Sequence, residues 1–423
     1  MHTTMLRRKS FSLILLFAFL MQNVHSVKIA VIPMFGKSHV HSMNLIAETL
    51  MQRGHESRPN RCSSFQVRIA VEKTQTVPDM KTPVDIYESR RPANFSHVKD
   101  NKSMFDALND FAEVLEEHCH GILNNSNIMA YYKTIDILVT DRGYLCNNLV
   151  AMAANKPHVV ISPGSFNLHR GLLGNPSPLS YIPQLGSGLP SAMNFKHRLL
   201  NCLFYVIWSS THSIYFRSTV DKVNRHYKIN PSMSAEETEY TPSLLLIPAD
   251  FILEFPRPVL PNVKVIGPIT TQWAKPLPND LETFLTGNTK VIYVSFGSII
   301  ESFSQEKMDI LVNAFNQLPY KILWRNKFNI KNLGKHVKVL PWLPQNDILG
   351  HSNVVAFLSH CGHNGMYEAA FHGVPILGMP IQFDQFGNLQ LILRADIGLG
   401  LNFNNLTSND IINGIQKLLT NER

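Results

Sequence analysis

The 423-residue sequence predicts an α/β protein made of two doubly wound domains. Short runs of β-branched residues alternate with longer amphipathic stretches, which is the pattern of β-α units around a parallel sheet. The alternation occurs twice, on either side of a proline-rich segment at residues 267–279 that is typical of a linker. The length exceeds that of one ordinary domain, and 44% hydrophobic residues can fill two cores. We therefore expect two domains that face each other.

The first 26 residues predict a secretory signal peptide. Basic residues at positions 7–9 precede an apolar run at residues 11–21, and we expect cleavage after Ser26. An uncleaved membrane anchor is the weaker alternative, because the run is short for a span and a strand is expected to begin at Val27.

In the first half, buried-strand and helix patterns alternate in order along the chain. We expect strands at residues 28–32, 135–140 and 158–161, with helices at 43–53 and 144–155. The second half repeats the pattern. We expect strands at 291–295, 321–324 and 354–358, with helices at 305–318 and after Gly362. The predicted domains are a signal (1–26), an N-terminal domain (27–267), a linker (268–279) and a C-terminal domain (280–423).

The other composition signals fit a chain of the endoplasmic reticulum lumen or secretory pathway. N-glycosylation sequons begin at Asn94, Asn101, Asn124 and Asn405. The five cysteines have no paired spacing, so at least one is unpaired within the chain and no pairing is predicted. The net charge of +8 includes the three basic residues of the signal, and no basic stripe is present, which argues against nucleic-acid binding.

An apolar stretch at residues 199–216 is interrupted by polar residues at 209–213. This pattern favours a packed or interfacial helix over a membrane span, and it leaves association with a membrane surface open. The oligomeric state, including pairing with related chains, is open as well.

The segment at residues 342–385 carries the most informative constellation. Its strand ends near His360, and Gly362 and Gly365 let the backbone turn closely into a helix. The free N–H groups and positive end of such a helix can hold a diphosphate, to which His360 and Asn364 would add donors.

Side chains around this turn suit the rest of a nucleotide sugar. Glu368 lies one helical turn after Asn364, where its carboxylate can accept two ribose hydroxyls. Trp342 can stack on a flat base, and Gln345 can bind an amide edge. Asp384 and Gln385, at the carboxyl end of the next strand, can bind sugar hydroxyls.

A metal cluster is the alternative interpretation of this segment. Histidines and a cysteine that could bind zinc occur at His360, Cys361, His363 and His372. The spacing lacks a second paired ligand set, and a helix end stabilises a diphosphate without an ion, so no metal is expected.

These spaced positions resemble the signature of the UDP-glycosyltransferase superfamily, which includes the UDP-glucuronosyltransferases. The resemblance implies the GT-B fold of two facing Rossmann-like domains and a UDP-sugar donor, either UDP-glucuronic acid or UDP-glucose. It places uracil on Trp342 and Gln345, and ribose on Glu368. It adds the strand-end residues Ser298 and Arg325, in Phe-Gly-Ser and Trp-Arg motifs expected to face the same cleft.

For the remaining groups of the donor, the resemblance agrees with the interpretation from the residues. The phosphates are expected on His360, Asn364 and the amide of Gly365, and the transferred sugar on Asp384 and Gln385.

The resemblance also implies a catalytic histidine after the first strand and an aspartate that orients it. His39, in a Ser-His context, matches the base, and Asp141 matches the aspartate. Neutral histidine suits the removal of a hydroxyl proton near neutral pH. His41 lies two residues further on and remains a rival.

The function implied is inverting transfer of glucuronic acid or glucose to a hydroxyl of a small lipophilic acceptor. The alternative is an inactive, truncated relative that binds nucleotide sugars or regulates partners. Family members usually continue past a segment like residues 410–419 into further helices and a membrane span, whereas this sequence stops at Arg423. The C-terminal domain is therefore expected to be truncated.

Overall fold

The computed structural model describes residues 27–34, 37–52, 56–59, 61–63, 66–68, 104–162, 175–297, 303–382 and 384–420. The predicted signal peptide, Asn94, Asn101 and Ser298 lie outside the described residues. Asn124 and Asn405, which begin the other two sequons, are exposed.

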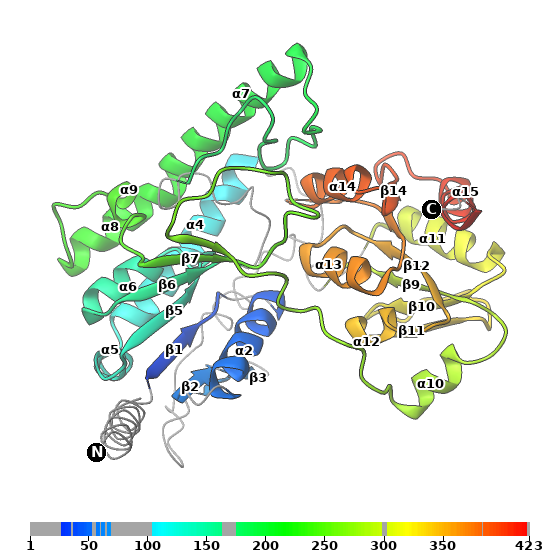
Figure 1. Ribbon diagram of the computed structural model, residues 1–423, viewed down its shortest axis with the longest axis horizontal. Helices are drawn as coiled ribbons and strands as arrows, with labels where there is room; N and C mark the ends of the chain where they lie inside the picture. The colour runs from blue at the N-terminus through cyan, green and yellow to red at the C-terminus, as the bar shows by residue number, and fades with distance from the viewer. Residues whose placement is uncertain are drawn as a thin grey trace, which may run out of the picture.

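The described chain forms two six-stranded parallel sheets lying side by side, with helices packed around each (Figure 1). The first sheet has the order β2-β1-β5-β6-β7-β8. Its strands are β1 (Lys28–Ile32), β2 (Glu56–Pro59), β5 (Ile137–Asp141), β6 (His158–Ile161), β7 (Leu244–Ile247) and β8 (Val263–Val265). A small antiparallel pair, β3 (Arg61–Ser63) and β4 (Gln66–Arg68), stands apart from it.

The second sheet has the order β11-β10-β9-β12-β13-β14. Its strands are β9 (Val291–Ser295), β10 (Lys321–Arg325), β11 (Val337–Leu340), β12 (Val354–Ser359), β13 (Ile376–Gly378) and β14 (Gly398–Gly400). The order reverses between β1 and β5 in the first sheet and between β9 and β12 in the second. Doubly wound sheets bind ligands outside the carboxyl ends of the strands at such reversals.

The helices flank these sheets. In the first half they are α2 (Lys37–Gln52), α4 (Met104–Leu123), α5 (Ser126–Lys133), α6 (Asn147–Ala154), α7 (Phe195–Thr211), the π-helix η3 (His212–Arg217), α8 (Ser218–Tyr227) and α9 (Ala235–Thr238). In the second half they are α10 (Asn279–Leu285), α11 (Gln305–Gln317), α12 (Gln345–Leu349), α13 (His363–His372), α14 (Gln385–Arg394) and α15 (Ser408–Thr420).

One predicted boundary is wrong in a way that matters. The first helix was expected to begin at residue 43, but α2 begins at Lys37 and carries His39 in its first turn. The inward face of α2 includes the buried Ser42 as well as the buried Met43 and Ala47. Because the first inward residues are polar, the apolar periodicity starts later than the helix does.

The two halves share one hydrophobic core. The buried Val160, Leu245 and Phe255 of the first half belong to the same cluster as Val291 and Tyr293 of the second. Further clusters fill the space between each sheet and its own helices. The halves are therefore packed together and not only joined by the chain between β8 and α10.

A disulfide joins Cys119 of α4 to Cys146, the residue before α6. The sequence did not predict this pair, because it depends on how α4 packs rather than on spacing. Cys202 and Cys361 are free thiols, one exposed and one buried. Crosslinks of this kind persist in oxidising compartments.

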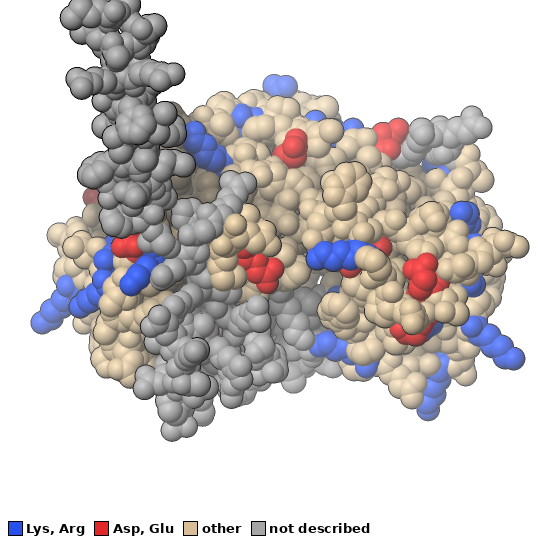
Figure 2. Space-filling model, turned by 60° about the horizontal axis from the view of Figure 1, so that its bottom comes forward, with Lys and Arg blue, Asp and Glu red and all other residues tan. Residues whose placement is uncertain are grey.

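Within the described ranges, no helix has both the length and the apolar character needed to cross a bilayer. On the face shown in Figure 2, lysine, arginine and acidic side chains are scattered among neutral residues without a continuous basic stripe.

Candidate active site

His39 and Asp141 meet at the strand reversal of the first sheet. Asp141 ends β5, His39 lies in the first turn of α2, and Nδ1 of His39 is 2.8 Å from Oδ2 of Asp141. The other carboxylate oxygen accepts the backbone N–H of Gly143 at 2.7 Å. The Asp141 side chain is fully buried, whereas that of His39 is 30% exposed. The pair is therefore a fixed carboxylate that orients a partly accessible imidazole.

The electrostatics of the pair favour a base. Burial lowers the pKa of His39, but the charge and hydrogen bond of Asp141 outweigh it and leave the pKa raised, and Asp384 raises it further. With its Nδ1–H donated to Asp141, the imidazole presents Nε2 as the atom that can take a proton. His41, by contrast, is exposed on α2.

The turn between β12 and α13 lies at the strand reversal of the second sheet. Its left-handed residue is Cys361, with φ of 64°, and not Gly362, whose φ is −65°. Left-handed φ is unusual for a residue that has a side chain. The positive φ of the turn thus belongs to Cys361, whereas Gly362 and Gly365 allow the expected close approach of the backbone, because a Cβ would lie 2.6 Å from His360 at the first and 3.1 Å from Gln345 at the second.

Gly362 and Gly297 instead make room for His360. A Cβ added to Gly362 would lie 2.6 Å from Nε2 of His360, and one added to Gly297 would lie 2.5 Å from the same atom. The imidazole of His360 therefore lies between Gly297 and Gly362, two positions at which the backbone carries no side chain.

His360 is neutral in this environment. Its Nδ1 lies 3.3 Å from the carbonyl oxygen of Ser295 and donates to it. Burial lowers the pKa of His360 to about 4, and nearby Arg325 lowers it as well, although the Ser295 hydrogen bond opposes them. Nε2 is therefore unprotonated and needs a proton before it can donate to a phosphate.

The first turn of α13 offers further donors. Gly362 is the N-cap, and as a glycine it has no side chain to cap the N–H groups of that turn. The N–H groups at the start of this ten-residue helix can bind an anion, because they have no acceptor within the helix. The Asn364 amide in the same turn lies 3.4 Å from Oγ of Ser42 in α2. The helix thus points its free end toward the half that carries His39.

Glu368 and Gln345 form a hydrogen-bonded chain behind this turn. Nε2 of Gln345 donates to Oε2 of Glu368 at 2.6 Å, and Oε1 of Gln345 accepts from the Tyr293 hydroxyl at 3.2 Å. Burial raises the pKa of Glu368 to about 7, although hydrogen bonds from Gln345 and Thr270 oppose the shift. Gln345 and Glu368 thus satisfy part of each other's hydrogen-bonding capacity.

Two aromatic residues predicted nearby differ in exposure. Trp342, just after β11, is 69% exposed and presents a flat surface. Trp324 is fully buried, with its ring centroid 5.0 Å from that of Phe315. Of the Trp-Arg motif expected to face the cleft, Trp324 therefore belongs to the core. Arg325 ends β10 and is partly exposed.

Asp384 and Gln385 begin α14 instead of ending a strand as predicted. Nδ2 of Asn388 donates to Oδ2 of Asp384 at 2.8 Å and to the carbonyl of Cys361 at 2.9 Å. Asn388 is fully buried and ties the Cys361 turn to Asp384. Sequence reasoning missed it, although its place one helical turn after Asp384 was a usable signal. Oε1 of Gln385 accepts the backbone N–H of Ile381 at 2.8 Å.

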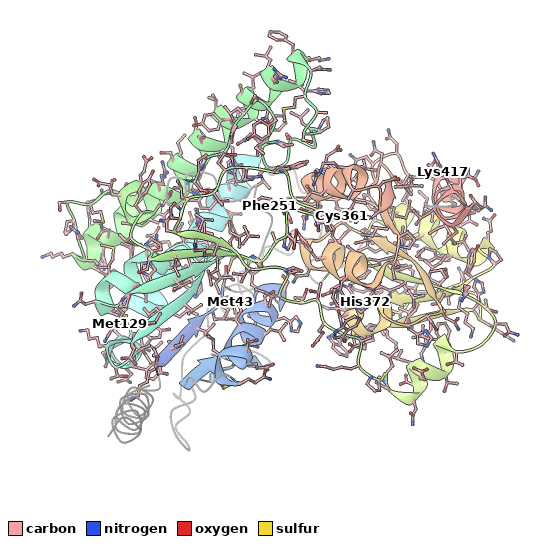
Figure 3. All side chains as sticks on the ribbon, in the orientation of Figure 1. Met43, Met129, Phe251, Cys361, His372 and Lys417 are labelled. Atoms are coloured by element: carbon pink, nitrogen blue, oxygen red, sulfur yellow. A yellow bond between two sulfur atoms is a disulfide. The ribbon has the colours of Figure 1, made fainter. Side chains whose placement is uncertain are left out.

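The residues of the alternative metal cluster bond to different partners. Nε2 of His363 lies 3.0 Å from the carbonyl of Pro248, and Nε2 of His372 lies 3.1 Å from Oδ1 of Asn346. Figure 3 shows Cys361 and His372 at opposite ends of α13. In the part of the chain that the structure describes, no three histidine, cysteine or acidic side chains are grouped to hold an ion.

Several hydrogen bonds join the two halves beside the site. The Tyr367 hydroxyl accepts the Asp250 N–H at 2.9 Å and donates to the Asp250 carbonyl at 3.2 Å. Arg394 donates to the carbonyls of Leu253 and Glu254 at 2.8 and 2.9 Å. Together with the His363 contact, they attach α13 and α14 to the segment after β7.

Residues 27–423 match the family described as "UDP-glucoronosyl and UDP-glucosyl transferase". The chain is 30% identical over 402 residues to the 2-hydroxyacylsphingosine 1-beta-galactosyltransferase of Mus musculus, covering 93% of this chain and 73% of that protein. It is also 30% identical over 407 residues to the UDP-glucuronosyltransferase 2A2 of Homo sapiens, covering 90% and 75%.

Solved structures show a similar fold. A UDP-glucosyltransferase from Polygonum tinctorium, in complex with 3,4-dichloroaniline, superposes with a TM-score of 0.61 at 18% identity, covering 95% of this chain and 91% of that one. Phytolacca americana UGT2, complexed with UDP-2fluoro-glucose and pterostilbene, gives a TM-score of 0.59 at 17% identity, covering 95% and 91%. The two parallel sheets and these neighbours confirm the predicted GT-B fold.

Proposed function

The chain belongs to the UDP-glucuronosyl and UDP-glucosyl transferase family and is a UDP-glycosyltransferase, and we propose that it transfers a hexose to a hydroxyl of a small lipophilic acceptor with inversion. The observation that carries the proposal is the contact between His39 and Asp141 opposite the uncapped end of α13. The imidazole of His39 is proposed to take the proton of the acceptor, and the first turn of α13 to bind the diphosphate that leaves.

The proposed reaction is a single displacement. Nε2 of His39 takes the proton of the acceptor hydroxyl while its oxygen forms a bond to the anomeric carbon. The bond from that carbon to the diphosphate oxygen breaks, and UDP leaves with the electron pair. Attack from the face opposite the leaving group inverts the anomeric carbon. Asp141 stabilises the imidazolium that forms.

The donor is proposed to bind the second half, residues 280–423, and the acceptor the first half, residues 27–267. The diphosphate is proposed to bind the first turn of α13 with His360, Asn364 and Gly365, because this helix end has no side-chain cap.

The remaining donor contacts follow the predicted assignments. Trp342, 69% exposed, is proposed to stack on uracil. Gln345 and Glu368 exchange their mutual hydrogen bond for bonds to uracil and ribose. Asp384 and Gln385 are proposed to bind the transferred sugar. Arg325, at the carboxyl end of β10, is proposed to contribute to the same site. Ser298, which the resemblance also assigns to the donor, lies outside the described residues.

Relatives give the range of sugars to test. Their names include galactosyl and glucuronosyl transfer, and one of them acts on a 2-hydroxyacylsphingosine. A lipophilic acceptor, as in xenobiotic conjugation, and either UDP-glucuronic acid or UDP-glucose as donor are therefore proposed, with UDP-galactose as a further candidate. The Cys119–Cys146 disulfide supports the endoplasmic reticulum lumen or secretory pathway as the location.

The test is UDP release by the purified chain from a panel of UDP-sugars with a generic phenol as acceptor. Product formation that His39→Ala abolishes and His41→Ala preserves would support the proposal. UDP binding without turnover of any donor would instead favour the inactive, nucleotide-sugar-binding relative. The anomeric configuration of the product, read by NMR, tests inversion directly.

A further inference from the structure

Helix α7 buries two polar residues and exposes several large apolar ones. Its only buried residues are Asn201 and Thr211. Five exposed residues define what we call the apolar stripe: Phe195 at 84%, Leu199 at 54%, Leu203 at 51%, and Val206 and Ile207 at 57% each. Four of them recur every four residues, and Val206 falls between them, so the five lie within about 120° of one face of the helix. Phe204 and Trp208, each 37% exposed, lie on its other side. A contiguous exposed apolar face of this kind marks a binding surface.

The buried polar residue explains how α7 is held with the stripe facing away. Nδ2 of Asn201 donates to the carbonyls of Leu179 and Ile182 at 2.8 Å each, and its Oδ1 accepts the N–H of Gln184 at 2.8 Å. The helix is thus fixed to the loop before it by its polar side. In Figure 1, α7 projects from the first half away from the other helices.

The stretch of sequence that contains α7 carries charge of one sign. Asp141 and Asp221 are consecutive acidic residues in the sequence, and the 79 residues between them contain six lysines and arginines. Two of these, Lys196 and Arg198, are exposed in the first turn of α7. At about 100° per residue, they lie on opposite sides of Phe195. Arg198 therefore lies beside the stripe, and Lys196 lies within its angular range at the end near Phe195.

We propose that α7 docks on the surface of an anionic phospholipid bilayer, with the apolar stripe in the headgroup–acyl boundary and Lys196 and Arg198 among the phosphates. An amphipathic helix with basic flanks binds membranes in this way. A helix of 17 residues spans about 25 Å, less than the hydrocarbon core of about 30 Å, so α7 lies along the surface.

A second copy of the chain is the less favoured occupant. A symmetric dimer through α7 would bury the stripe of each copy but would supply no acidic partner for Lys196 and Arg198. A bilayer that contains anionic lipid supplies the opposite charge.

Docking would set the position of the acceptor half. The chain continues from α7 into η3, which begins at His212. Burial lowers the pKa of His212, and so does the positive charge of nearby Arg142, the residue after Asp141. The base of α7 is therefore close to the strand end that carries Asp141. If the proposed function is correct, docking holds the acceptor site beside the membrane, where lipophilic acceptors accumulate. The docking itself does not depend on that function.

The test is co-flotation of the full chain with phosphatidylcholine vesicles that contain or lack phosphatidylserine. We expect binding that requires phosphatidylserine and that Leu199→Glu with Ile207→Glu abolishes. The matched control, Val259→Glu with Phe328→Glu, replaces two exposed apolar residues elsewhere and should bind like the parent. Because all four side chains are exposed, thermal melting should show that both double variants fold.

A charge series separates attraction from apolar contact. Lys196→Gln with Arg198→Gln should weaken partitioning by about fivefold per charge removed, whereas the control Lys331→Gln with Lys335→Gln should not. Absence of vesicle binding, or equal binding by the stripe variant and the parent, would overturn the proposal. A dimer that light scattering detects without lipid, and that the stripe substitutions dissociate, would overturn it as well. If the parent chain floats with the vesicles but shows no transferase activity, that result would count against the proposed function and leave the docking proposal standing.

Discussion

The side-chain amide of Asn364 lies 3.4 Å from the hydroxyl of Ser42, although the two residues are 322 positions apart in the sequence. Asn364 lies in the first turn of α13, and Ser42 lies one turn after His39 on α2. The helix proposed to hold the diphosphate is thus in direct contact with the helix that carries the proposed base. The separation between the leaving group and the base is therefore set by one interface.

Asp141→Asn should lower kcat by roughly 10²- to 10⁴-fold, because an amide neither stabilises the imidazolium nor fixes its tautomer. Asp141 is what raises the pKa of His39, so the acidic limb of the kcat/KM profile should move to lower pH in this variant. A pH profile of product formation checks both effects. His41→Ala is the control, and an unchanged acidic limb in Asp141→Asn would contradict the assignment of the base.

Binding of UDP should take up a proton at His360. Nδ1 already donates to Ser295, and the pKa of about 4 leaves Nε2 unprotonated until a diphosphate arrives. Calorimetric titration near neutral pH, in two buffers of different ionisation enthalpy, should therefore give different apparent enthalpies. His360→Gln carries an amide donor that needs no extra proton, so its buffer dependence should vanish. Identical enthalpies for the parent in both buffers would show that His360 stays neutral.

Gly362→Ala should weaken UDP binding without unfolding the chain. The new methyl group would lie 2.6 Å from Nε2 of His360 and must displace the imidazole, while φ of −65° accepts alanine. We expect Kd to rise by about tenfold or more, which corresponds to about 1.4 kcal/mol. Gly121→Ala in α4 is the matched control, since nothing lies within 4 Å of its added Cβ. That control should be neutral or slightly stabilising, and equal UDP affinities for the two variants would refute the steric role of Gly362.

Glu368→Gln should stabilise the protein at high pH while weakening UDP binding. A carboxyl group whose pKa rises from 4.5 to about 7 on folding binds more protons in the folded state, so stability falls as pH rises through that window. The amide variant lacks this loss and should gain on the order of 2–3 kcal/mol over the parent above pH 7 and little below pH 4.5. Denaturant titration at both ends of the range measures the difference. A gain that did not depend on pH would exclude titration of Glu368 as its cause.

Replacing both Cys119 and Cys146 by alanine should lower the free energy of unfolding by about 3 kcal/mol, because the crosslink closes a loop of 27 residues. The melting temperature should fall, and thiol titration of the denatured parent should show fewer reactive thiols before reduction than after it. Cys202→Ser, at an exposed free thiol, is the control and should melt like the parent. A parent that reducing agent does not destabilise would argue against the crosslink.

Much of the fold was predictable because strong apolar runs determine the strands. The runs at residues 158–161 and 291–295 became β6 and β9 with the predicted ends. The resemblance implied a histidine after the first strand and an aspartate after a later one, and His39 and Asp141 lie in contact at one edge of the first sheet.

Features that depend on packing were not predictable. The disulfide, the bond from Asn388 to Cys361 and the bond between Gln345 and Glu368 all join residues whose separation in the sequence says nothing about their contact. The left-handed turn at Cys361 was missed because the glycine beside it is the more obvious candidate for such a conformation.

The shared core limits how freely the two halves can be exchanged between relatives. Phe255 is buried in the same cluster as Tyr293, and residues 250–254 accept or donate the hydrogen bonds of Tyr367 and Arg394. A chimera joined within the chain between β8 and α10 would bring together two surfaces that had not evolved to fit. Such a graft should retain a compact product only when the segment after β7 comes from the same parent as α13 and α14.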